Sequence, residues 1–200
     1  MAFFDQVEPD DLGGERVPAV SAIPPRTVTL ARRIPCSAVL VKSSKLCVAI
    51  TDLQCWPQHL SIELTILTVG ESRDQAEFML FSGFAARPLD TRRPRFAAIF
   101  ADGRYATNLR PAASPISYPG GISEDFPVLT PFGAGGGGGG GAPEQISWRH
   151  VQTVDLWPLP PPGALKFVLD WPDRQIGEVE HELDGQKIRD AAAEAIQIWP

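Results

Sequence analysis

Alternation of apolar and polar side chains from residue 59 to 66, in a segment that extends to 68, limits the fold of this sequence more than any other feature. A period of two puts successive side chains on opposite faces of a β-strand, and no helix matches it. The apolar side chains on one face are Leu60, Ile62, Leu64 and Ile66, and the polar ones opposite are His59, Ser61, Glu63 and Thr65. We therefore predict a strand with an apolar face and a polar face.

Shorter segments with strand character follow one another along most of the chain. They cover residues 27–30, 36–41, 46–51, 77–84, 95–100, 104–109, 146–157, 165–171 and 176–183. Proline and glycine, with 20 and 18 of the 200 residues, are unfavourable inside helices. Strands and helices do not alternate, so a parallel sheet is not indicated. We predict a mainly β protein: an antiparallel β-sandwich, jelly-roll-like or Ig-like, with one C-terminal α-helix.

Three segments without strand character define the domain organisation. Residues 1–25 are acidic and show no sustained period, which predicts a flexible N-terminal tail before a single domain at 26–200. Residues 111–145 include seven consecutive glycines, Gly135 to Gly141, and predict a disordered Pro/Gly-rich loop. Residues 184–198 predict the helix, because Asp184 is a suitable N-cap for it. Its apolar stripe consists of Ile188, Ala192, Ala195 and Trp199.

Two local patterns predict where strands end. Asp102-Gly103 is typical of a two-residue hairpin turn, since glycine tolerates a positive φ. Proline cannot donate to a strand ladder and pushes the preceding residue into extended geometry, so Trp-Pro pairs indicate strand ends. An aromatic-lined groove is the alternative interpretation. The tryptophans followed by proline are Trp56, Trp157, Trp171 and Trp199.

Charge and targeting signals exclude several classes of protein. The formal net charge is −6, so the chain lacks the basic field typical of nucleic-acid-binding proteins. Residues 1–15 have neither a basic start nor an apolar run, and no segment reaches the ~18 apolar residues of a membrane span. The three cysteines Cys36, Cys47 and Cys55 cannot all pair, which suits a reducing compartment. We therefore predict a cytoplasmic protein that binds neither nucleic acid nor a membrane.

Motifs for cofactors, metals and nucleophiles are missing from the sequence. Ala142-Pro143-Glu144 follows the glycine run where a phosphate-binding loop would have Lys-Ser/Thr and a helix. The cysteines and histidines lack the spacing of metal ligands, and there is no G-x-S-x-G motif. We predict no cofactor and no metal.

The histidines and carboxylates offer one candidate catalytic site. His59 begins the polar face of its strand and is expected to be exposed, whereas His181 is expected in the core. His150 lies in mixed aromatic and polar company. We consider it a candidate catalytic residue, with Asp155 or Asp170 as the carboxylate partner.

Two charged groups are candidate binding residues. An arginine cluster could contact phosphate or an acidic protein, although it lacks the interleaved aromatics of nucleic-acid sites. An acidic row on one strand face is either a solvated edge that resists edge-to-edge pairing or a docking stripe for a basic partner. The residues are Arg92, Arg93 and Arg95 in the cluster and Glu178, Glu180 and Glu182 in the row.

The C-terminal third resembles a group of uncharacterised actinobacterial proteins. The resemblance rests on the pattern from Trp157 to Gly163 (WPLPPPG), on Trp171-Pro172, and on Leu183-Asp184-Gly185 followed by an alanine-rich helix. Residues 100–104 and the glycine-rich loop fit the same group, so the resemblance covers about 26–200. The group carries no assigned activity, cofactor or site, and the resemblance implies a cytosolic single-domain β protein.

Two functions from different classes are open at this point. The leading hypothesis is a non-enzymatic β-sandwich module that binds a protein or a small ligand, because no catalytic signature is assembled. The alternative is a small-molecule hydrolase or another enzyme with a site near His150 on the rim of the sandwich.

Overall fold

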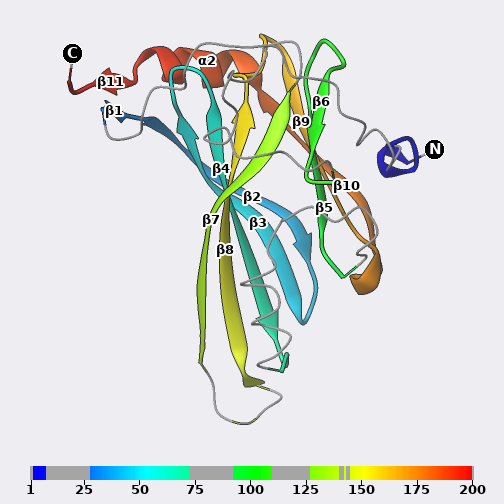
Figure 1. The fold of residues 1–200 in the computed structure, drawn as a ribbon. Helices are drawn as coiled ribbons and strands as arrows, with labels where there is room; N and C mark the ends of the chain where they lie inside the picture. The colour runs from blue at the N-terminus through cyan, green and yellow to red at the C-terminus, as the bar shows by residue number, and fades with distance from the viewer. Residues whose placement is uncertain are drawn as a thin grey trace.

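The computed structural model describes residues 2–7, 28–72, 92–109, 127–139, 142 and 145–199, and these form two main antiparallel β-sheets packed on each other and one small two-stranded sheet (Figure 1). The larger sheet has five strands in the order β2 (Arg32–Lys42), β3 (Leu46–Cys55), β4 (Leu60–Val69), β8 (Ser147–Trp157) and β7 (Val128–Gly139). The smaller sheet has four, in the order β10 (Ile176–Asp184), β9 (Ala164–Trp171), β5 (Arg95–Ile99) and β6 (Tyr105–Thr107).

The remaining elements are short and lie around the two sheets. They are η1 (Phe3–Asp5), β1 (Thr29–Leu30), η4 (Pro172–Arg174), α2 (Gly185–Ala193) and β11 (Ile196–Gln197). The helix α2 lies across the end of the sandwich at which β8 ends (Figure 1). The predicted antiparallel sandwich with one C-terminal helix is thus confirmed. The strand predicted at 77–84 lies outside the described residues.

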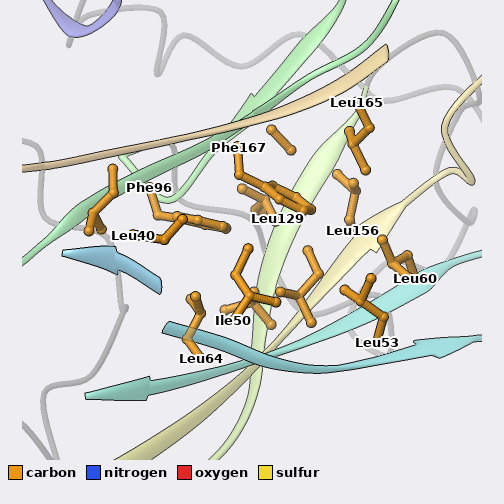
Figure 2. Close-up of a cluster of buried hydrophobic side chains, with 14 of the residues drawn as sticks. Leu40, Ile50, Leu53, Leu60, Leu64, Phe96, Leu129, Leu156, Leu165 and Phe167 are labelled. Carbon is orange, nitrogen blue, oxygen red and sulfur yellow. The ribbon is translucent and has the colours of Figure 1, made fainter. Parts of the chain in front are cut away.

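The core lies between the two sheets and consists of the side chains that strand alternation turns inward (Figure 2). Phe96 of β5 and Phe167 of β9 stack with ring centroids 5.5 Å apart. They face apolar side chains of the larger sheet, among them Ile50 and Leu64, and all four are fully buried. Burial of each such side chain contributes roughly 1.5–3 kcal/mol, so this layer dominates the stability of the fold.

The polar face of β4 is also covered, which corrects the prediction that His59 is exposed. His59 is only 4% exposed, and its ring stacks on that of Trp56 with centroids 5.5 Å apart. The backbone N–H of Trp56 donates to the carbonyl of His59 and folds the tryptophan back over the strand start. The ring of Trp157, at the end of β8, also lies near the His59 ring, with centroids 6.4 Å apart. Alternation assigns His59 to the surface because it takes no account of these aromatic neighbours.

Part of the glycine run forms a strand, which corrects the prediction of a disordered loop at 111–145. Gly135 to Gly139 belong to β7 and pair residue by residue with Val151 to Ser147 of β8. A strand ladder is made by backbone groups, so it needs no side chains from β7 when β8 already supplies a firm template. The ring of Trp148 lies against Gly138, where a side chain would not fit. Residues 110–126 lie outside the described residues.

Both predicted ends of the chain also need correction. The helix stops at Ala193 instead of continuing to 198, because Ile196 pairs with Leu30 and leaves Trp199 60% exposed. At the N-terminus, residues 2–7 do not form a flexible tail: Phe4 is 5% exposed and packs on the smaller sheet. Residues 8–25 of the predicted tail lie outside the described residues.

The turn chemistry is largely as predicted. The β5–β6 hairpin has a three-residue loop instead of a two-residue one, since Phe100 and Arg104 pair across it and Gly103 takes φ 87°. The interpretation of Trp-Pro pairs as strand ends is confirmed at three sites. Trp157 ends β8, Trp171 ends β9, and Trp56 directly follows β3.

We expect Gly138→Ala to destabilise the protein and Gly137→Ala to leave its stability unchanged or slightly higher. A Cβ on Gly138 would overlap the ring of Trp148, whereas one on Gly137 meets nothing within 4 Å. Overpacking costs about 1–3 kcal/mol, and Gly→Ala at a compatible position gains about 0.4–1 kcal/mol. Urea unfolding of the two variants measures the difference; equal midpoints would contradict the pairing of the glycine run with β8.

Candidate functional site

The structure does not bring the predicted catalytic residues together, which corrects that constellation. His150 lies on the inner face of β8 with Gln152, whereas Asp155 is five residues further along and therefore on the opposite face. The Asp155 carboxylate accepts a hydrogen bond from the Ser61 hydroxyl at 2.7 Å. Asp170 belongs to β9 in the other sheet and forms an ion pair there with its cross-strand neighbour. The sequence shows the strands but not which faces meet.

His150 instead lies near an ion pair that joins the two sheets. Glu71, just after β4, is buried and pairs with Arg174 of η4. The Thr68 hydroxyl donates to the Glu71 carboxylate at 2.8 Å, and the indole N–H of Trp148 donates to the backbone carbonyl oxygen of Glu71 at 3.3 Å. This cluster connects the end of β4 to the end of β9.

The His150 ring is held as a neutral imidazole. It is 4% exposed, and neither ring nitrogen has a hydrogen-bond partner among the described residues. Burial lowers the pKa of His150; Glu71 acts against this effect, and Arg174 reinforces it. No group of three or more His, Cys, Asp or Glu side chains in the described ranges is arranged to hold a metal ion. The cluster is therefore best explained as a buried polar contact between the sheets.

The predicted arginine cluster is engaged in the fold. Arg95 pairs with Asp170 across the strands, with 3.4 Å between nitrogen and oxygen. The carbonyl of Arg92 accepts a hydrogen bond from the Trp171 indole at 2.9 Å. Arg92 and Arg93 make further interactions within the protein. These residues anchor the start of β5.

The acidic row lies on β10, which is an edge strand of the smaller sheet. Glu180 and Glu182 are exposed, and Glu180 makes a loose ion pair with Lys166 at 3.7 Å. This placement supports the interpretation of a solvated edge for these two residues. Glu178 differs, because it is half-buried and accepts hydrogen bonds from the N-terminal backbone.

A pocket of about 210 Å³ opens at the end of the sandwich beside α2, and we call it the rim pocket. Four segments that are distant in sequence form it: the β3–β4 turn, the β5–β6 hairpin, the proline-rich connector between β8 and β9 (residues 158–163), and α2. Its lining residues are Pro57, Gln58, Arg104, Trp157, Pro158, Leu159, Pro161 and Arg189. The sequence analysis does not identify this pocket, although two of the predicted Trp-Pro pairs contribute to it.

The proline-rich connector positions the walls of the rim pocket. It starts with a cis peptide bond between Trp157 and Pro158, and the N–H of Leu159 donates to the Gln58 carbonyl at 3.1 Å. Its far end meets α2, where the N–H of Gly185 donates to the Gly163 carbonyl at 2.7 Å. A Cβ on Gly185 would collide with the backbone of the connector. Glycine at this position therefore permits the close approach that seats α2.

Helix α2 brings a second arginine to the pocket. Asp184 caps the helix by accepting a hydrogen bond from the N–H of Gln186 at 2.9 Å. One turn later, the Arg189 guanidinium donates to the Pro160 carbonyl at 3.3 Å. Arg189 has no ion-pair partner among the described residues.

The rim pocket has a positive charge and unused hydrogen-bonding atoms. Arg104 is ion-paired with Asp102 at 2.7 Å, and hydrogen bonds from Arg104 lower the pKa of that carboxyl. Since Asp102 offsets one arginine, Arg189 leaves a net positive charge. Within the described residues, the Gln58 side-chain oxygen and the Trp157 indole N–H are buried without a hydrogen-bond partner. Buried polar groups are usually paired, so these two atoms are exceptions in the wall of the pocket.

No protein-family model matches the chain, and no curated protein sequence matches it. The resemblance to actinobacterial proteins is not tested by these comparisons and stays a prediction. In the described part of the chain, no helix has the length and apolar character needed to cross a membrane.

The burial of neutral His150 predicts a pH-dependent stability. Its pKa in the folded protein lies below the unfolded value of 6.5, so the unfolded chain binds more protons at acidic pH. The folded state therefore loses stability as the pH falls below 6.5, by at most about 1.4 kcal/mol per pH unit from this group.

The variant His150→Leu removes this contribution, because an apolar side chain that does not titrate replaces the imidazole. We expect its free energy of unfolding to fall less between about pH 7.5 and pH 5.5 than that of the native protein. Urea unfolding at the two pH values measures this. Parallel losses in both proteins would show that His150 does not carry the effect.

Proposed function

We propose that the protein is a non-enzymatic binding module whose rim pocket takes a small oxyanion, a carboxylate or a phosphate. One observation carries this proposal. Two arginines, Arg104 and Arg189, line the same hollow. Together they supply the positive charge that an oxyanion needs, and only one of them is offset by an ion pair.

Arginine is well suited to this role because its planar guanidinium matches the two oxygens of a carboxylate or phosphate. Arg104 is held in place by Asp102 and by the Phe100 ring, whose centroid lies 5.5 Å from its guanidinium carbon. Arg189 is positioned by its bond to the connector. The pocket is therefore preorganised on both sides, which lowers the entropic cost of binding.

The size of the rim pocket limits the ligand. A volume of about 210 Å³ is smaller than the roughly 300–1,000 Å³ usual for sites of drug-sized molecules. A compact metabolite with one acidic group fits this space better than a nucleotide or a folded partner. The three thiols are free, which agrees with the cytoplasmic location that we propose for this module.

No observation favours the alternative of a hydrolase near His150. The carboxylates proposed to assist it lie on other faces, and the rim pocket lies at the opposite end of β8. His150 pairs across the strands with Ile66 and Gly136, whereas the pocket begins at Trp157. The binding module is thus the better-supported function.

Isothermal titration of the full chain with phosphate, acetate and succinate tests the proposal. We expect at least one of these anions to bind, and Arg189→Gln to weaken its binding about 10- to 100-fold, the loss of a charge-assisted hydrogen bond. Lys187→Gln is the matched control, since Lys187 is exposed on the same helix and does not line the pocket.

The control separates a site from general charge attraction. Binding by Lys187→Gln should stay within about twofold of the native value, because a solvent-exposed charge contributes little at ordinary ionic strength. Equal loss in both variants, or no heat with any of the three anions, would contradict an oxyanion site in the rim pocket.

A further inference from the structure

The outer face of the smaller sheet carries a second apolar cluster, which the N-terminus covers. Ala97 of β5 and Val168 of β9 are fully buried although they lie outside the core between the sheets. The segment Ala2–Val7, which we call the N-terminal segment, packs on them through Phe4. Val7 is also buried, at 7% exposure. The contact involves residues that the sequence assigns to a flexible tail.

Glu178 of β10 holds the N-terminal segment by its main chain. Its two carboxylate oxygens accept hydrogen bonds from the consecutive N–H groups of Phe3 and Phe4, at 2.7 and 2.6 Å. These N–H groups begin the turn η1 and have no partner within it, so a carboxylate is favoured there. Bonds of this kind, with an ionised acceptor, are among the stronger ones in proteins.

Aromatic rings give the same contact its selectivity. The Phe3 ring meets Tyr105 of β6 edge-on, with centroids 5.2 Å apart and planes at 89°. Main-chain bonds to Glu178 accept nearly any residue, whereas the two phenylalanines fit particular places on the sheet. We call the surface formed by Ala97, Tyr105, Val168 and Glu178 the N-terminal dock. In this structure it contacts two adjacent aromatic residues, Phe3 and Phe4.

Charged side chains lie around the edge of the dock. Burial raises the pKa of Asp170; Glu178 and Asp5 add to this effect, and Arg95 acts against it. Three carboxylates and the guanidinium of Arg95 therefore interact at the edge of the dock, and one of the carboxylates belongs to the N-terminal segment. A terminal segment held by few contacts opens more readily than the main core.

The chain between the N-terminal segment and the sandwich is long enough to reach a neighbour. Twenty residues, 8–27, separate Val7 from Val28. Fully extended, such a length spans up to about 70 Å, against a radius of gyration of about 16 Å for a domain of this size. This length of chain, which we call the tether, is therefore sufficient for the N-terminal segment to reach the dock of its own chain or that of another copy.

We propose that the N-terminal dock is a peptide-binding surface that takes the N-terminal segment of a second copy of this chain in exchange for its own. The same hydrogen bonds and ring contacts form in either case, so the interface needs no new chemistry. The tether gives a chain's own segment a high effective concentration, so exchange is expected at high protein concentration or when the chain's own contact is weakened.

A complementary pair of full-length variants tests this directly. Phe4→Ala keeps the dock but weakens its own segment, and Glu178→Gln keeps the segment but removes the carboxylate that holds it. We expect each variant alone to be monomeric and an equimolar mixture to form a 1:1 complex, seen by sedimentation velocity at about 0.1–0.5 mM. Circular dichroism and a cooperative unfolding transition establish that each variant is folded.

One matched control decides the outcome. In the control mixture, Phe4→Ala is combined with Glu180→Gln, which changes an exposed residue on the same strand. We expect no complex there, because the Glu180→Gln protein has an intact dock that retains its own N-terminal segment. Phe3→Ala replaces Phe4→Ala if the latter does not fold, since Phe3 is only half-buried. Folded variants whose mixture sediments as monomer would overturn the proposal, as would a complex that forms equally with Glu180→Gln.

Discussion

The pairing of β8 with both of its neighbours is the constraint on which the rest of the structure depends. β8 forms ladders along its whole length with β4 on one side and β7 on the other. Its alternation turns Val154 and Leu156 into the core at one end and places His150 beside the Glu71 ion pair at the other. Its last residue, Trp157, then enters the rim pocket. One strand thus positions the core, the buried polar cluster and the candidate site.

The sequence predicts those parts of the fold that depend on local periodicity and turn chemistry. Strand alternation at 60–68 and the Trp-Pro pairs at Trp157 and Trp171 correctly indicate strands and their ends. The sequence leads to wrong predictions for elements whose backbone conformation depends on pairing with another strand. Gly135 to Gly139 have no propensity of their own for a strand, and among the described residues the strand that pairs with them is β8. The helix ends early for the same reason, because Ile196 pairs with Leu30.

The candidate site is less predictable than the fold, because its members come from four distant segments. Arg104 and Arg189 lie 85 positions apart in the sequence, and neither lies in a motif. The residues that the sequence does single out have structural explanations: Arg95 pairs across strands, and His150 is sequestered between the sheets. Glu178 is the exception, since one of the two interpretations of the acidic row was a docking function. The structure gives it main-chain N–H groups as partners instead of basic side chains.

The rim pocket and the N-terminal dock meet at the β5–β6 hairpin, where Arg104 lines the pocket and the next residue, Tyr105, contacts Phe3. Chemical-shift mapping of the ¹⁵N-labelled full chain during titration with phosphate and succinate tests most directly whether the rim pocket is the ligand site. We expect shifts to concentrate on the Trp157 indole N–H, on Gln58 and on the first turns of α2. Shifts centred on Arg92, Arg93 and Arg95, or none at millimolar anion, would contradict it.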